Sequence, residues 1–87
     1  MAHNVIFESI KDIDLSVLER PQVAVFLYDE DYPGKIVGKI MDSGQKTNMN
    51  IVRDYVTEVY EDIRKYTDLQ WCCRGKDDVI ELLGVFL

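Results

Sequence analysis

The run Gln22–Tyr28 constrains the fold most, because its residues are largely β-branched or aromatic and are apolar on both faces of a strand. A strand of this kind belongs in the centre of a sheet whose two faces are both covered. The next segment, Lys35–Met41, fits either a helix with Pro33 at its start or a strand interrupted by Gly38. The strand is the better interpretation, because it forms a hairpin with the preceding strand.

Shorter segments on either side of this hairpin predict the rest of the sheet. Asn4–Ser9 and Leu69–Arg74 are rich in β-forming residues and are predicted to be strands. A turn is expected at 75–78, and Val79–Leu87 fits either a last strand or a short helix.

A short helix is predicted for Leu15–Arg20, because Asp12 or Asp14 provides an N-cap and Pro21 ends the helix. The residue before a proline avoids the helical conformation, so this element does not continue into the central strand.

A long helix is predicted for Thr47–Tyr66, with Thr47 or Asn48 as its N-cap. Its apolar residues recur at steps of three and four and form one stripe: Met49, Val52, Tyr55, Val56, Val59, Tyr60, Ile63 and Tyr66. The predicted core combines part of this stripe with the central strand: Val25, Leu27, Val52, Val56, Val59 and Ile63.

The order strand, short helix, strand, strand, long helix, strand matches the ferredoxin-like βαββαβ arrangement, followed by a C-terminal element. We therefore expect a single α+β domain over residues 1–87. Its small sheet has four to five mostly antiparallel strands, and the long helix packs on this sheet.

The chain of 87 residues is acidic, with 16 Asp and Glu against 10 Lys and Arg and a net charge of −6. This charge argues against binding to nucleic-acid phosphates. No apolar run approaches the ~18 residues of a membrane span, and the N-terminus lacks the features of a secretory signal. A cytoplasmic protein without direct contact to nucleic acid or membrane is expected.

Cys72 and Cys73 are adjacent, so their side chains point to opposite faces of the predicted strand. We expect two reduced thiols without a disulfide, one buried and one exposed. A redox switch is the alternative. A zinc site is disfavoured, because His3 is the only histidine and tetrahedral zinc takes four nitrogen or sulfur ligands.

Residue patterns of catalytic sites are missing from the sequence. A Ser-His-Asp or Cys-His site would depend on His3, and Gly34-Lys35 lacks the other residues of a phosphate loop. We therefore expect no enzymatic activity, no cofactor and no metal. Trp71 and Leu69 share one face of their strand and are expected to pack on the long helix; exposure of Trp71 at a partner surface is the alternative.

The first candidate site is the outer face of the long helix, with Asp54, Glu58, Glu61 and Asp62. The like-charge pairs Asp54–Glu58 and Glu58–Asp62 cost up to about 0.5 kcal/mol each, so their replacement is predicted to preserve or raise stability. A solvated surface is the simple interpretation. The functional interpretation is a negative strip that binds a basic groove of another protein.

The second candidate site is the loop Asp29, Glu30, Asp31 and Tyr32, which follows the central strand. Its acids lack the spacing of a calcium-binding loop. A solvated turn is the simple interpretation, and a contact surface is the alternative, because tyrosine beside polar residues is typical of interfaces.

These features together predict a non-enzymatic, acidic protein-binding module. We expect a small inhibitor or regulator, like those of phages and mobile elements, that occupies a basic surface of a larger protein, such as a nucleic-acid-binding groove. The alternative is a small-ligand-sensing or dimerising regulatory domain, which would form a homodimer through a sheet edge.

Overall fold

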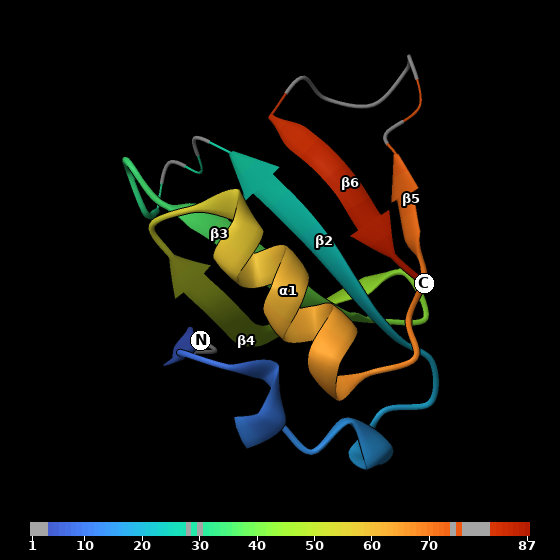
Figure 1. Ribbon diagram of the computed structural model, residues 1–87. Coiled ribbons are helices and arrows are strands. Elements are labelled where there is room, and N and C mark those ends of the chain that lie inside the picture. Colours follow the sequence, from blue (N-terminus) through green and yellow to red (C-terminus); the bar gives the residue numbers. More distant parts are fainter. Residues whose placement is uncertain (1–3, 28, 30, 74, 76–80) are drawn as a thin grey trace.

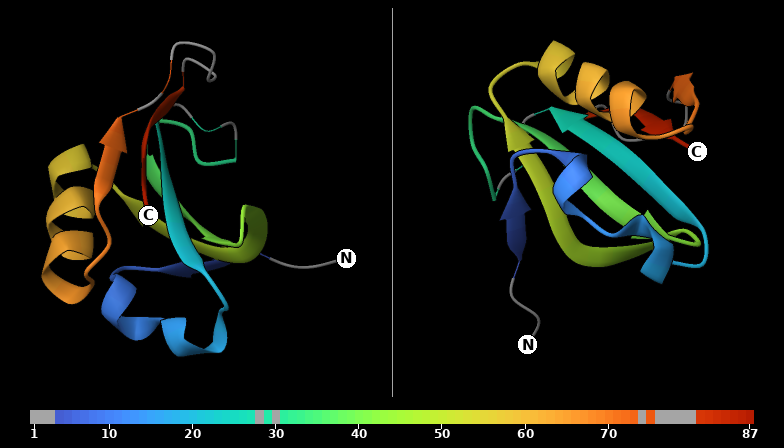
Figure 2. Two further views of the ribbon diagram at one scale, coloured as in Figure 1. Left: turned by 90° about the vertical axis from the view of Figure 1, so that its right-hand side faces the viewer. Right: turned by 60° about the horizontal axis from the view of Figure 1, so that its bottom comes forward.

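The computed structural model describes residues 4–27, 29, 31–73, 75 and 81–87. Six strands of these residues form one mixed sheet, in the order β1-β4-β3-β2-β6-β5, and one α-helix packs on one of its faces (Figures 1 and 2). The predicted α+β class is confirmed. The ferredoxin-like arrangement is not confirmed, because no α-helix lies between β1 and β2. The expected four to five mostly antiparallel strands are not confirmed either, because the described sheet has six strands and β1 is parallel to β4.

The strands are β1 (Val5–Phe7), β2 (Pro21–Leu27), β3 (Ile36–Asp42), β4 (Gln45–Arg53), β5 (Trp71–Cys73) and β6 (Leu82–Phe86). Two 3-10 helices, η1 (Ile10–Asp12) and η2 (Leu15–Val17), follow β1, and α1 (Val56–Tyr66) follows β4. The strands predicted from the sequence are therefore confirmed as β1, β2, β3 and β5, and the C-terminal segment, for which a strand and a helix were both open, contains the strand β6. Most of the predicted turn, at 76–78, lies outside the described residues.

The predicted short helix at Leu15–Arg20 is wrong in length and type, because only Leu15–Val17 is helical, and as a 3-10 turn. Asp14 caps this turn by accepting a hydrogen bond from the backbone of Ser16, as the sequence suggested. Ser9 caps the preceding turn in the same way through Lys11.

The central hairpin is confirmed: β2 pairs antiparallel with β3, from Pro21 opposite Asp42 to Leu27 opposite Ile36. A second hairpin joins β3 to β4 through Ser43 and Gly44, which both have positive φ angles (52° and 82°). Such two-residue turns match the right-handed twist of antiparallel strands.

This second hairpin overturns the first half of the predicted long helix, because residues 45–53 form β4 and α1 begins only at Val56. The predicted N-cap is also wrong. The Thr47 hydroxyl instead donates to the carbonyl of Ile40 at an irregularity in the β3–β4 pairing. The spacing of the apolar residues in this segment fits the period of a helix and that of a strand, and the hydrogen bonds to β1 and β3 favour the strand.

The main core lies between α1 and the sheet. Val59 and Ile63 of α1 are fully buried. Gly38 of β3 permits the close packing of Val59 on the sheet, since a Cβ at Gly38 would lie 3.4 Å from Val59 Cγ1 and 3.2 Å from Val23 Cγ1. The buried cluster comprises Ile10, Ile13, Val23, Val25, Ile36, Ile40, Ile51, Val59, Ile63 and Phe86.

Three of the six predicted core residues, Val25, Val59 and Ile63, are buried. Leu27 and Val52 are half-buried, and Val56 is exposed, so the prediction for Val56 is wrong. Val56 lies in the first turn of α1, which begins later than the sequence pattern suggested.

An aromatic cluster closes the other end of the core. Trp71 of β5 contacts Tyr60 of α1 and Phe86 of β6, with ring centroids 5.6 and 4.9 Å apart. The predicted packing of Trp71 on the helix is therefore confirmed. Cys72 and Cys73, which precede Arg74 in the undescribed part, are free and both exposed, so the prediction of one buried thiol is wrong.

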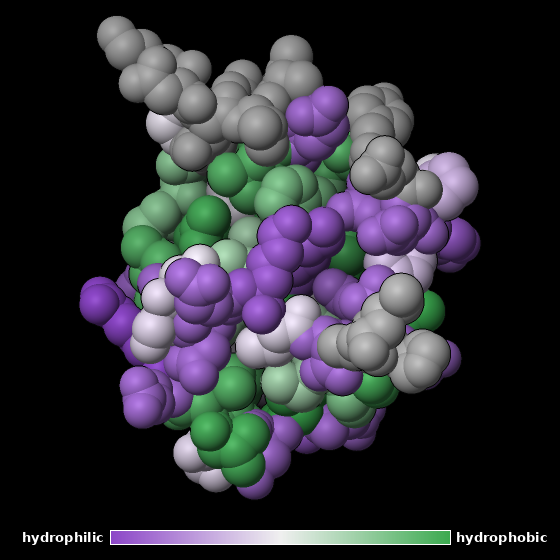
Figure 3. All heavy atoms as spheres, turned by 180° about the vertical axis from the view of Figure 1, so that it is seen from behind, coloured by the Kyte–Doolittle hydropathy of each residue, from purple (hydrophilic) through white to green (hydrophobic). Residues whose placement is uncertain are grey.

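The second face of the sheet is covered by no helix of the described chain, contrary to the expectation for β2 (Figure 2). Because Gly38 faces α1, its neighbour Lys39 faces away, opposite Ala24 and Asn50 on the adjacent strands. Hydrophilic residues cross the middle of this face, with hydrophobic ones above and below (Figure 3). No described helix has the length and apolar character needed to span a membrane.

Candidate functional site

Asp62 of α1 does not lie on a solvated outer face. Its carboxylate accepts hydrogen bonds from the Ser9 hydroxyl at 2.6 Å and from the Ile10 amide at 2.7 Å. Both donors are buried and belong to the segment that leads from β1 into η1. Asp62 therefore joins the helix to a segment more than fifty residues earlier in the chain.

Asp54 pairs with Lys35, the residue before β3, and Glu58 pairs with Arg53 of β4. Asp54 lies in the linker before α1, not on the helix, and its carboxylate accepts a hydrogen bond from Lys35. This hydrogen bond, together with the attraction between the two opposite charges, lowers the pKa of Asp54 and raises the pKa of Lys35. Glu58 pairs with Arg53 of β4 at 3.2 Å.

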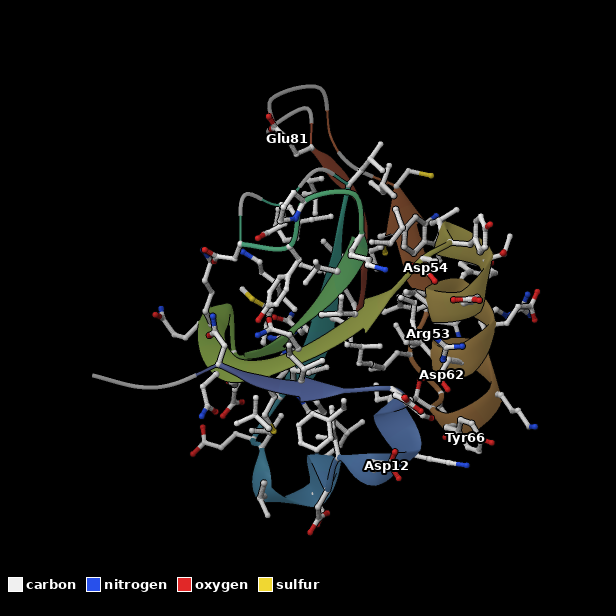
Figure 4. The ribbon with its side chains drawn as sticks, turned by 90° about the vertical axis from the view of Figure 1, so that its left-hand side faces the viewer. Asp12, Arg53, Asp54, Asp62, Tyr66 and Glu81 are labelled. Atoms are coloured by element: carbon white, nitrogen blue, oxygen red, sulfur yellow. The ribbon has the colours of Figure 1, made fainter. Side chains whose placement is uncertain are left out.

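The predicted acidic strip is therefore a set of partnered carboxylates along one side of the molecule. Figure 4 shows Asp54, Arg53, Asp62 and Tyr66 along α1 and its neighbouring segments on this side, and Asp12 of η1 beside Tyr66. We call this surface, made by η1, the end of β4 and α1, the acidic side. The structure thus brings together the helical site residues but removes Asp54 from the helix.

Glu61 is the predicted site residue that remains exposed on α1 without an ion pair to any described residue. It lines a broad, open depression of about 600 Å³, whose other walls come from α1 and Arg53. Tyr66 lies at the end of this depression with 43% of its surface exposed, and the Lys65 and Lys11 ammonium groups lie 5.3 and 5.8 Å from its ring centroid.

The predicted loop site behaves differently, because Asp29 is buried. Its carboxylate pairs with the ammonium of Lys39 at 2.8 Å and accepts a hydrogen bond from the backbone of Asp31 at 2.9 Å. Burial raises the pKa of Asp29, but these two hydrogen bonds and the charges of Lys39 and Lys46 outweigh it, so the pKa is lowered. Asp29 is therefore an ionised structural residue rather than a free surface acid.

The remaining loop residues lie near the uncovered face of the sheet. Asp31 is exposed and Tyr32 is half-buried, and both line a small pocket with Lys39, Lys46 and Asn50 of the hairpin β3–β4. Glu30 lies outside the described residues. The structure therefore separates the two predicted sites: the acidic side flanks α1, and the loop lies by the opposite face.

The lysines and the asparagine of this pocket were missed by the sequence interpretation. Asn50 was assigned to the long helix, where an asparagine is unremarkable. In the strand, Asn50 pairs with Ile6 of β1 on one side and with Lys39 of β3 on the other. A polar residue at the centre of a sheet was the signal, and the incorrect helix concealed it.

Within the described residues, no three His, Cys, Asp or Glu side chains come together in a way that could hold a metal ion. His3 lies outside those residues. Comparison with known protein families, curated proteins and solved structures found no match to this chain.

Proposed function

We propose that this protein is a non-enzymatic binding module that docks on a basic surface of a larger protein through its acidic side. The observation that carries the proposal is that three carboxylates of this side are fixed by different parts of the fold. Asp54 is paired with β3's neighbour Lys35, Glu58 with β4, and Asp62 with the start of η1.

Fixed carboxylates favour binding, because their side chains lose little further freedom when a partner arrives. The paired carboxylates can still contact a partner protein, because the Asp54 side chain is well exposed and that of Glu58 is partly exposed. Glu61 and Tyr66 add a free charge and an exposed aromatic ring to the same side, and tyrosine is enriched at protein interfaces. The net charge of −6 steers the chain toward a basic partner.

The experiment uses two exposed acids, so that the fold is preserved. Glu61→Lys and Asp12→Lys are compared with Glu81→Lys, which makes the same charge change far from the acidic side (Figure 4). The tagged chain is used to capture partners from cells of its source, and contacts are mapped by cross-linking and mass spectrometry. We expect a salt-sensitive, stoichiometric complex that the first two variants weaken and the control retains.

Equal capture by all three variants would remove the acidic side from the proposal. Equal loss in all three would show that only net charge matters, and would also contradict a defined docking surface. Slower association at low salt, with little change in dissociation, is the kinetic signature that we expect of the two site variants.

The runner-up, a small-ligand-sensing domain, is supported by one different observation, the pocket beside Tyr32. Its chemistry does not depend on the acidic side. If the protein is instead a dimerising regulatory domain, its interface would use the edge strands of the sheet, β1 and β5. A change in oligomeric state on dilution would support dimerisation.

A further inference from the structure

A small pocket lies on the uncovered face of the sheet, away from α1 and the acidic side. It encloses about 140 Å³ between the loop after β2 and the hairpin β3–β4, and Asn4 before β1 closes it. A water molecule occupies about 30 Å³ in the liquid, so the pocket has room for several waters or one small molecule. It is smaller than the ~300 Å³ at which sites for drug-sized ligands begin.

Asn50 is the first sign that this pocket is built for a ligand. Asn50 is only 5% exposed, it lines the pocket, and its side-chain amide has no hydrogen-bond partner among the described residues. Among the described residues, no fully buried side-chain nitrogen or oxygen lacks a hydrogen-bond partner, so the amide of Asn50 is open to the pocket and not sealed in the core. The amide thus offers unused hydrogen bonds to whatever enters the pocket.

The lysines are the second sign. Lys39 is a largely buried lysine, with 18% of its side chain exposed, and its ammonium lies 2.8 Å from Asp29 and 4.9 Å from the centre of the Phe26 ring. Lys46 lines the same pocket and also acts electrostatically on Asp29. The charges of two lysines therefore act on the buried carboxylate of Asp29, and of the two only Lys39 forms an ion pair with it.

The other walls supply few competing acceptors. The Thr47 hydroxyl donates to the carbonyl of Ile40, so its hydrogen is already used. Tyr32 is half-buried, and Asp31, which also lines the pocket, is an exposed residue. Among the described lining residues, Lys39, Lys46 and Asn50 therefore supply side-chain N–H donors, and Asp31 supplies a carboxylate.

We propose that this pocket binds a small oxyanion, the phosphate or carboxylate group of a metabolite, with Lys39, Lys46 and the amide of Asn50 as its donors. Hydrogen bonds to an ionised acceptor are about twice as strong as neutral ones, so this assignment uses the lysines and the amide together. The site is separate from the acidic side, so neither proposal depends on the other.

The test is a titration of the ¹⁵N-labelled chain with inorganic phosphate and, separately, with acetate, at constant ionic strength adjusted with chloride. We expect saturable shifts of the Asn50 side-chain amide and of the Lys46 backbone amide, and a higher thermal midpoint. Saturation by phosphate alone or by acetate alone would support the proposal and identify the group.

Three variants make the test specific. Lys46→Gln changes an exposed residue and is expected to weaken binding at least about tenfold, as for loss of one charged hydrogen bond. Lys35→Gln is the matched control, because it removes the same charge from the Asp54 pair outside the pocket, and it should leave affinity unchanged. Asn50→Val removes the amide donor and should abolish the rise of the thermal midpoint on addition of the anion.

Shifts that grow linearly with both anions, or that chloride reproduces, would overturn the proposal and leave a pocket that holds water. Equal effects of Lys46→Gln and Lys35→Gln would overturn it as well, because they would show an unspecific response to charge. Lys46→Gln keeps this outcome measurable even if Asn50→Val does not fold.

Discussion

Replacement of Asp62 by alanine should destabilise the protein strongly, although the charge pattern alone predicts a slight gain. The carboxylate is the acceptor for the Ser9 hydroxyl and the Ile10 amide. Each buried donor left without an acceptor costs about 1–3 kcal/mol. The Ile10 amide belongs to an almost fully buried residue, so its loss should cost an amount near the upper end of this range. The loss at Ser9 should cost less, because Asp62 beside it is only half-buried and water can replace part of the hydrogen bond. We therefore expect a loss of about 2–4 kcal/mol.

The gain from relieving the repulsion between Glu58 and Asp62 is at most about 0.5 kcal/mol, so the lost hydrogen bonds decide the outcome. Urea denaturation followed by the fluorescence of Trp71 measures the effect, because this residue is the only tryptophan and contacts the core. With a slope of about 1 kcal/mol/M, the midpoint should fall by about 2–4 M.

Two further variants test whether the lost hydrogen bonds cause the destabilisation. Asp62→Asn retains one acceptor oxygen and should lose less than Asp62→Ala, and Glu61→Ala, at the exposed neighbouring position, should change stability little. Faster hydrogen exchange of the Ile10 amide in Asp62→Ala would locate the damage. If Asp62→Ala and Glu61→Ala unfolded at the same urea concentration, Asp62 would be a solvated residue and the contact with η1 would be refuted.

Three more predictions concern other parts of the molecule. Gly84→Ala should cost about 3 kcal/mol or more, because its Cβ would lie 2.4 Å from the Trp71 ring and 2.8 Å from the Cys72 carbonyl; denaturation should show a smaller cost in a Trp71→Ala background. Asp29→Asn should destabilise at pH 7. Since the pKa of Asp29 is lowered on folding, this difference in unfolding free energy should shrink as pH falls below about 4 and vanish below the folded pKa. Cys72 and Cys73 are exposed, so iodoacetamide should add two labels, seen by intact mass, to the native chain without denaturant.

The sequence by itself determined the elements whose composition allows one conformation. The run of β2 is too rich in β-branched and aromatic residues for another assignment. The residues of β3 also fitted a helix, and the hairpin with β2 was the reason to prefer the strand. The apolar stripe of Val59 and Ile63 likewise specified the buried side of α1. These signals are local, so they needed no knowledge of neighbours in space.

Only the tertiary structure decided the state of residues 45–53, because their apolar spacing fits both a helix and a strand. Backbone hydrogen bonds to β3 on one side and β1 on the other selected the strand, and this choice placed Asn50 at the pocket. The state of the candidate site residues also depended on the tertiary structure. Whether a carboxylate is free or paired depends on its neighbours in space, and Asp62 finds its partners in a segment more than fifty residues away, beyond the reach of any local pattern.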